Sequence, residues 1–439
     1  MRLALRRHAR QPVHKSPHQR QSAIPPRVCY NGFVVTTHSS TREVQKPNNI
    51  TQGGIAMEYD TTIGVDVSDR TSKICVMRKI PGGERKILVE TTCATTAEGF
   101  AEAFARFDRS WPVVFETGTH CRWMDTCFRK LGFKDIIANP GKIPSITKSN
   151  TKNDRNDARE LARLAIADPE MLHPVKLRDE IFQQMLRYHH ARNVLVSQRT
   201  QIVSQIRGFA KSMGFRIESV AAESFHRLNR TEWPVELEDS VWPLLGVLKV
   251  LSVKIKAYDS LIVRMAEGPE FKEMVDRARC VYGIGIIGST VIVAAIGGDP
   301  DKFKHSRDIG PYLGLTPKQD QSGDVDKQLH ITKAGADIVR KALTECANVA
   351  MKSDAKDTDV KLKGLRVAMG GGPIARKKAK IAVARSLAVT VIALLKDPKA
   401  EYIPLSERGK EGFERYRNEM EFLAMKKRTG RSSKTAKAA

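Results

Sequence analysis

Four carboxylates lie where they could act together on one substrate. Asp66 interrupts an apolar, β-branched run that predicts a buried strand, and an acid there is costly to desolvate without a partner. Glu116 ends a second apolar run. Asp154 and Asp157 are three residues apart at the start of a predicted helix, so they share one helix face. Carboxylate oxygens placed in this way can hold two divalent cations about 4 Å apart, as in nucleases and polymerases.

Three of these carboxylates also have ordinary explanations. Thr151 and Asp154 match a capping box, and Asp157 suits the positive end of the helix dipole. Glu116 fits an ordinary charge at a strand end. Asp66 is harder to explain in this way, so the four in this order favour a shared metal site.

Composition and charge point to a polyanion as partner. The chain has 439 residues, enough for two or three domains, and a formal net charge of +25. Nucleic acid is the simplest partner for such a charge, ahead of an acidic substrate or an anionic membrane surface. No run of 18 or more apolar residues occurs, so we expect no membrane span. Seven cysteines lack zinc spacing and predict reduced core thiols in a cytoplasmic protein.

The first 56 residues differ from the rest of the chain. They are rich in Arg, His, Pro, Ser and Gln, with no acid before Glu43, which predicts a disordered basic extension. This composition also suits an organellar transit peptide. We favour a third interpretation, in which Met57 is the natural start and the extension is translated upstream sequence.

Residues 57–172 predict an α/β domain. Three consecutive predicted strands are followed by alternating helices and strands, which is the order of a ribonuclease H-like fold. In that fold the acid of the first strand lies at the centre of the sheet. The expected strands are 62–67, 72–77, 84–90, 112–115 and 135–138, and the expected helices are 96–107, 121–131 and one carrying Asp154.

Residues 173–268 predict two long helices. Apolar residues recur every seven positions from Ile181 to Phe209 and fill both seam positions of a heptad from Leu244 to Met265. This pattern favours an antiparallel coiled coil. Four arginines of the first helix fit a solvated face as well as a nucleic-acid-binding face: Arg187, Arg192, Arg199 and Arg207.

Residues 269–402 predict a mostly helical unit. Gly283 and Gly285 precede an apolar helix, 289–296, and backbone N–H groups at such a turn can hold a phosphate, although many such turns only join helices. Ser322 lies in a polar loop that no core requires, and an ordinary turn is the alternative. Further helices are expected at 336–351 and 376–395, and 403–439 form a basic tail. The predicted nucleic-acid contacts are Gly283, Gly285, Lys318, Lys333, Arg376, Lys377 and Lys378.

Several of these segments resemble one family. GVDVS, VVFETG and KNDRNDARELARL look like the RuvC-like domain of DEDD transposases of the insertion sequence 110 family. VYGIGIIGSTVIVAAIG, YLGLTPKQDQSG, ITKAGADIVRKAL and ARKKAKIAVARSLA look like the C-terminal transposase domain of that family. The resemblance covers about residues 59 to 400. It implies an α/β RNase H-like domain, a coiled-coil linker and a mostly helical C-terminal domain.

The resemblance also implies an activity. Such a recombinase excises and inserts a mobile element in the nucleoid of a bacterium, acting on the element ends and a target DNA. The acidic tetrad would bind Mg²⁺, with Mn²⁺ as an alternative, and Ser322 would be the nucleophile. Gln321 and Asp324 stand where the family often has a second serine and a second glycine. A structured guide RNA and a homodimer or tetramer are further implied.

A serine hydroxyl needs activation, and neither His330 nor Lys318 is compellingly close to Ser322 in sequence. Metal on the tetrad could polarise the phosphate, so the two domains must meet, within a chain or across a dimer. Two other classes remain open. One is a hydrolytic, structure-specific nuclease resembling a Holliday-junction resolvase, and the other is a non-catalytic nucleic-acid-binding protein.

Overall fold

The computed structural model describes residues 59–143, 154–322, 325–403, 414, 417–423 and 425. Side chains at 154–155 and 320–328 are not described. The expectations for residues 1–56, for the capping residue Thr151 and for most of the tail after 403 lie outside this part of the chain.

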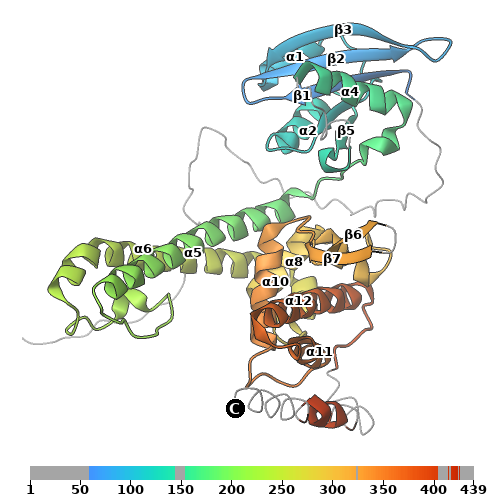
Figure 1. Ribbon diagram of the computed structural model, residues 1–439. Helices are drawn as coiled ribbons and strands as arrows, with labels where there is room; N and C mark the ends of the chain where they lie inside the picture. The colour runs from blue at the N-terminus through green and yellow to red at the C-terminus, as the bar shows by residue number, and fades with distance from the viewer. Residues whose placement is uncertain are drawn as a thin grey trace, which may run out of the picture. The chain divides into compact units, whose positions relative to one another are not determined.

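Five strands form one mixed sheet in the order β3-β2-β1-β4-β5 (Figure 1). The first three strands are antiparallel neighbours, and β4 and β5 run parallel to β1. The central position of β1 and this order agree with the expected ribonuclease H-like fold. The strands are β1 (Thr61–Val67), β2 (Thr71–Lys79), β3 (Arg85–Ala94), β4 (Val113–Glu116) and β5 (Asp135–Ala138).

Helices cover both faces of this sheet. Ile63 and Val65 of β1 face a core that also contains Phe100 and Phe128. Residues that alternate with them, such as Val114, face the other side and pack with Leu161. The first face is therefore covered by α1 (Ala97–Phe104) and α2 (Cys121–Lys130), and the second by α4 (Asp154–Ala167).

Two long helices, α5 (Glu180–Ser212) and α6 (Val235–Ala266), pack antiparallel. The Tyr188 and Tyr258 rings lie 6.3 Å apart at one end, while Ala210 and Leu237 share a core at the other. The antiparallel pair agrees with expectation, and a coiled coil remains a prediction. The seam expected on α6 is largely buried.

The heptad positions expected to be buried on α5, from Ile181 to Phe209, were wrong by about one residue. That register runs from Ile181, whereas the buried residues begin at Phe182. The reason is that the first turns of α5 pack into the core of the C-terminal helices and its last turns into a core shared with α6 and the loop between α5 and α6, so burial does not follow a single two-helix seam. The buried α5 residues are Phe182, Met185, Leu186, His189, Val203, Ile206 and Ala210.

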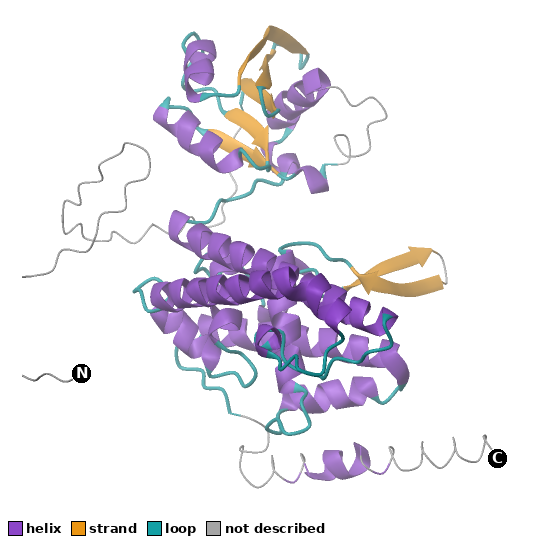
Figure 2. Ribbon diagram, turned by 90° about the vertical axis from the view of Figure 1, so that its left-hand side faces the viewer, coloured by secondary structure: helices purple, strands orange, loops and turns teal. Residues whose placement is uncertain are grey.

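The C-terminal unit packs around α8, in which every residue from Gly288 to Ile296 is buried. A two-stranded hairpin stands out from these helices where the sequence predicted a polar loop (Figure 2). No helix of the described segments is long and apolar enough to cross a membrane. The elements are α7 (Lys272–Arg279), α8 (Ile286–Ile296), α9 (Ile309–Tyr312), β6 (Pro317–Ser322), β7 (Val325–Ile331), α10 (Asp337–Ala350), α11 (Asp359–Ala368) and α12 (Gly372–Lys396).

Candidate active site

Asp66 and Glu116 lie side by side at one edge of the sheet. Val65 of β1 pairs with Phe115 of the parallel strand β4, and the two acids are the next residue in each strand. Side chains in register on parallel neighbours point to the same face. Because Val65 and Phe115 face the α1–α2 side, the two carboxylates belong to the α4 side. Both are partly buried.

Helix α4 lies against β1 at backbone contact distance. The Thr62 hydroxyl donates to the Ala162 carbonyl oxygen at 2.9 Å. A Cβ atom on Gly64 would lie 2.0 Å from the Ala158 carbonyl oxygen, so only glycine allows this approach. Two residues along a strand span about 6.6 Å, and four residues along a helix span about 6 Å. Each step of two residues forward along β1 is therefore matched by a step of four residues backward along α4.

Extending this pattern by one step predicts that the tetrad positions come together. Asp66 follows Gly64 by two residues, and Asp154 precedes Ala158 by one helical turn on the same stripe of α4. The start of α4 therefore lies at the edge of the sheet that carries Asp66 and Glu116. Asp157, which is partly buried, is in the same first turn.

A second contact holds α4 to β3, the strand at one edge of the sheet. Arg159 donates two hydrogen bonds to the Glu90 carboxylate of β3, and its Nη2 lies 2.9 Å from Glu90 Oε2. Cys75 lies beneath the helix in a small core. Burial, with a smaller contribution from Glu90, raises the pKa of the Cys75 thiol to about 11, although Arg159 opposes the shift. This thiol is therefore protonated and inert near pH 7.

Oxygen donors of this kind suit a hard divalent cation. Among the described side chains, which do not include that of Asp154, no three His, Cys, Asp or Glu groups lie close enough to hold a metal ion. The donor set and the register of its backbone fit a metal site. The tetrad as a site remains a prediction.

Lys73 is a neighbour that the sequence interpretation missed. It is the register partner of Asp66 on the antiparallel strand β2, so its side chain lies on the same face of the sheet as that of Asp66. Its ammonium group donates to Thr92 Oγ1 at 3.0 Å. A lysine on an alternating strand carries no distinctive signal, and only the strand pairing brings it next to Asp66.

Ser322 is the last residue of β6 and pairs with Val325 at the start of β7. It therefore lies at the tip of the hairpin rather than in an irregular loop. The expected loop was wrong because the polar segments before and after Ser322 pair with each other as two strands, and this pairing does not require an apolar face against the core. Lys318 and His330 are exposed near the base of the same hairpin.

The register separates these two candidate activators from Ser322. His330 is five residues beyond Val325, which corresponds to roughly 16 Å along the strand, and Lys318 is four residues before Ser322, roughly 13 Å. Neither can reach the hydroxyl of its own hairpin. Activation must come from another part of the protein or from the substrate.

The base of the hairpin is held tightly. Gly314 and Gly335 adopt positive φ, and a Cβ on Gly314 would lie 2.3 Å from the Ala334 backbone. Arg340 Nη1 donates to the carbonyl oxygens of Leu313, Ala334 and Gly335 at 3.2, 2.8 and 2.9 Å. A charged donor shared by three carbonyls fixes the point from which the hairpin projects.

Lys333 lies at this base and is exposed. Its φ of 56° places a non-glycine residue in the left-handed region, which costs about 1–2 kcal/mol. Strain of this kind persists only where the surrounding contacts impose it. Its predicted nucleic-acid contact remains a prediction.

The glycine turn before α8 has a packing role. A Cβ on Gly283 would lie 3.0 Å from the Ala350 Cβ and 3.1 Å from the Cys346 carbonyl oxygen of α10. The Gly285 N–H interacts with the Cys346 thiol, whose pKa burial raises to about 11. The turn therefore lets α8 and α10 pack closely, and phosphate binding there remains a prediction.

The α5 arginines hold the helical pair and its loop together. Arg192 pairs with Asp259 of α6. Arg207 donates to the carbonyl oxygens of Ile217 and Glu218 at 3.1 and 2.9 Å. Arg187 binds Glu180, and Arg199 lies 3.9 Å from Glu223. These contacts favour a structural role over the nucleic-acid-binding face.

The cations at the start of α12 differ from them. Arg376, Lys377 and Lys378 are exposed and form no salt bridge within the described part of the chain. They occupy the second turn of the helix.

Comparison with known proteins identifies the family. Residues 63–214 match a DEDD transposase model of the IS110 type, and residues 276–360 match the model of the Transposase IS116/IS110/IS902 family. Together the two ranges take up more than half of the chain. The chain belongs to the IS110 family of transposases.

Curated relatives agree with this assignment. The transposase of insertion sequence element IS1111A from Coxiella burnetii is 27% identical over 259 residues, covering 57% of this chain and 68% of the relative. The transposase of IS1328 from Yersinia enterocolitica is 28% identical over 55% of this chain and 71% of its own length. A pilin gene-inverting protein from Moraxella bovis is 26% identical over 64% of this chain and 80% of its own.

The two matched ranges correspond to the two halves of the transposase. All four tetrad positions lie within the first range, and Ser322 lies within the second. Arg376, Lys377 and Lys378 lie beyond both. DNA is the substrate of a transposase, and the DEDD family is metal-dependent.

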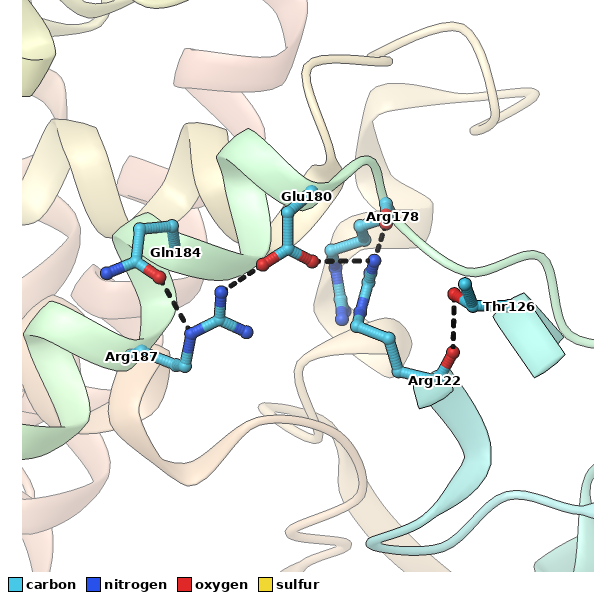
Figure 3. A network of polar contacts seen from close by, with 6 residues as sticks. All are labelled: Arg122, Thr126, Arg178, Glu180, Gln184 and Arg187. Atoms are coloured by element: carbon cyan, nitrogen blue, oxygen red, sulfur yellow. Dashed lines mark hydrogen bonds and ion pairs between the residues drawn. The ribbon is translucent and has the colours of Figure 1, made fainter. Parts of the chain in front are cut away.

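In this transposase a polar network connects α2 of the sheet domain with the start of α5 (Figure 3). Arg122 Nη1 donates to the Glu180 carboxylate at 3.0 Å, and Arg122 Nη2 donates to the Arg178 carbonyl oxygen. Arg187 binds the other oxygen of Glu180. Arg178 in turn donates to the Ala295 carbonyl oxygen of α8 at 2.7 Å. The segment before α5 thus contacts both halves of the transposase, which no sequence pattern indicated.

Proposed function

We propose that this transposase excises and inserts its element through a serine-linked DNA intermediate, with Mg²⁺ held by Asp66, Glu116, Asp154 and Asp157. The observation that carries the proposal is the stepwise packing of α4 on β1. It supports one edge of the sheet as the meeting point of the four carboxylate positions. Mn²⁺ could replace Mg²⁺ because the donors are all carboxylates.

Bound metal would supply Lewis-acid stabilisation of charge on the phosphate oxygens. Ser322 Oγ forms a new bond to phosphorus as one P–O ester bond of the DNA breaks. The serine proton ends on the departing sugar oxygen, which leaves a free hydroxyl on the DNA. Attack by a sugar hydroxyl of another strand reverses the step and frees Ser322.

This chemistry suits rejoining. The phosphoserine link conserves the energy of the broken diester, whereas hydrolysis loses it to water. The relative from Moraxella bovis is named for inverting a pilin gene, and inversion requires broken strands to be rejoined in a new order. A similar demand on this chain favours the covalent route over the nuclease alternative.

The halves that carry the tetrad and Ser322 have separate hydrophobic cores. We infer that the active site is completed when they meet, within one chain or between the chains of a homodimer or tetramer. The α5–α6 pair would serve as the coiled-coil contact between chains. The position of Ser322 at a hairpin tip supports this, since a tip can enter a site built elsewhere.

A structured guide RNA is also proposed as a partner. The support is electrostatic. A net charge of +25 is compatible with an RNA as well as a DNA partner, and exposed cations lie near the start of α12. Gly283, Gly285, Lys318 and Lys333 would add contacts to the same nucleic acids.

The test is a covalent adduct. Protein, Mg²⁺, element-end DNA and the RNA transcribed from the element end are incubated, denatured and separated. We expect a protein–DNA adduct that maps to Ser322 by mass spectrometry. Ser322→Ala should abolish it, and Ser353→Ala, at an exposed turn, should leave it unchanged.

The same experiment distinguishes the nuclease. Asp66→Asn should abolish both cleavage and adduct while DNA binding persists. Strand cleavage by Ser322→Ala without an adduct would show that water is the nucleophile, and the serine mechanism would then be wrong.

A further inference from the structure

A cavity of about 460 Å³ lies where the loop between α5 and α6 folds against α6. One wall comes from the short helix η3 (Phe225–Arg227) and the residues just before it. The other comes from four α6 residues spaced i, i+3, i+4 and i+7, which places them on one helix face. These are Lys249, Ser252, Val253 and Lys256.

Ser252 in this cavity is unlike the other serines of its helix. Ser240 and Ser260 donate to the carbonyl oxygens four residues earlier, at 2.7 and 3.1 Å. Ser252 is 6% exposed, and its hydroxyl has no hydrogen-bond partner among the residues that the structure describes. A buried hydroxyl without a partner is destabilising. A ligand that accepts a hydrogen bond in the cavity would remove that cost.

The charge of the lining favours an anion. Lys249, Lys256 and Arg227 are exposed cations around the opening. The acidic residue of the lining, Glu223, lies 3.9 Å from Arg199, which partly offsets its charge.

His226 also lines the cavity. Burial lowers the pKa of its imidazole, and Arg227, Lys249 and Lys256 lower it further, although a hydrogen bond to the Glu223 backbone opposes them. Its Nδ1 is buried and has no partner within the described segments. Two unpartnered polar atoms and three cations therefore surround one cavity.

We propose that this cavity binds a phosphodiester group of the nucleic acid on which the transposase acts. Lys249, Lys256 and Arg227 neutralise the phosphate, and Ser252 donates to one of its oxygens. Nucleic acid carries one phosphodiester group per nucleotide, so this is the anion that the proposed partners would supply. The inference therefore rests on the proposed nucleic-acid partners. It adds a contact far along the chain from both the tetrad and Ser322.

The test reads the site directly. The full chain, free or saturated with single-stranded DNA, duplex DNA or RNA, is treated briefly with an acetylating reagent, and lysine modification is measured by mass spectrometry. We expect nucleic acid to protect Lys249 and Lys256 at least threefold. Lys254, on the same helix but outside the lining, serves as the control and should remain reactive.

Variants make the test quantitative. Ser252→Ala should weaken binding about three- to tenfold, whereas Ser260→Ala, which loses only a bond within the helix, should not. Lys249→Gln with Lys256→Gln should reduce the log–log salt slope by about 1 to 2, because each neutralised phosphate contributes about 0.9. Circular dichroism confirms that each variant is folded.

The outcomes separate this site from the proposed function. Protection by RNA alone or by DNA alone supports the site and identifies its ligand. Protection of Lys377 and Lys378 without protection of Lys249 and Lys256 would overturn the site while the transposase still binds nucleic acid. If no lysine is protected and no binding occurs, the proposed partners fail as well.

Discussion

The tetrad edge and the Ser322 hairpin are built in opposite ways. At the edge, α4 touches β1 backbone to backbone, through Gly64 and Ala158. Among the described contacts, the hairpin is anchored at its base, and Leu329 on β7 is 46% exposed. One region is held by packing and the other by a few hydrogen bonds.

The difference matches the proposed chemistry. Carboxylates that share a cation must be held within a fraction of an ångström, which requires rigid elements. A nucleophile that attacks a bulky DNA phosphate must protrude, so a hairpin tip suits it better than a core position. Precision is therefore expected to depend on packing in the first region and on the anchoring hydrogen bonds in the second.

The largest effect is expected from Gly64→Ala. The new Cβ would lie 2.0 Å from the Ala158 carbonyl oxygen, so α4 must move away from β1. Cleavage should fall at least about 100-fold, since displacements near 1 Å have such effects. Gly208→Ala, where a Cβ meets nothing within 4 Å, is the control. Unchanged cleavage in Gly64→Ala would show that the α4 contact does not position the tetrad.

The next effect concerns nucleic-acid binding by the helical half. Replacing Arg376, Lys377 and Lys378 with Gln should reduce the log–log salt slope by up to about 2.7, since each contacted phosphate contributes about 0.9. Arg192→Gln is the control because that arginine is engaged with Asp259. Equal slopes in the triple variant and the wild type would assign the three cations to solvation.

A smaller effect is expected at the base of the hairpin. Arg340→Ala removes the donor to three carbonyl oxygens, so the hairpin should become less well placed. Adduct formation should slow about tenfold, while the adduct still maps to Ser322. Lys341→Ala, which loses only a surface pair with Asp337, should react at the normal rate. A normal rate in Arg340→Ala would mean that substrate binding orders the hairpin.

The last prediction concerns stability rather than activity, as a pH dependence of the helical half. Burial, with contributions from Arg192 and His190, lowers the pKa of His189 to about 3 from 6.5. The unfolded chain therefore binds a proton between pH 6.5 and 3 that the folded chain does not. Stability from this group is complete above pH 6.5 and falls with pH below it, by up to about 1.4 kcal/mol per unit.

Chemical denaturation between pH 7 and 4.5 measures this dependence. His189→Gln should flatten it, and His190→Gln, at an exposed position, should not. A steep dependence that survives in His189→Gln would assign the acid sensitivity to other groups.

Much of the α/β half was predictable. The strand around Asp66 alternates apolar residues, and β5 has the limits expected of it. The hairpin was missed because its polar residues lack the alternation that marks a half-buried strand. The α5 seam was misplaced because one end of that helix packs against the C-terminal helices and the other against the loop between α5 and α6 as well as against α6.

The sequence by itself determined which residues could do chemistry and which family they belong to. Local periodicity and motif order are written along the chain, so they can be read without coordinates. Tertiary structure alone decided that Lys73 lies next to Asp66, that Gly64 admits α4 and that Ser252 faces a cationic cavity. These relations join residues from different elements, and only the packing of those elements sets the distance between them.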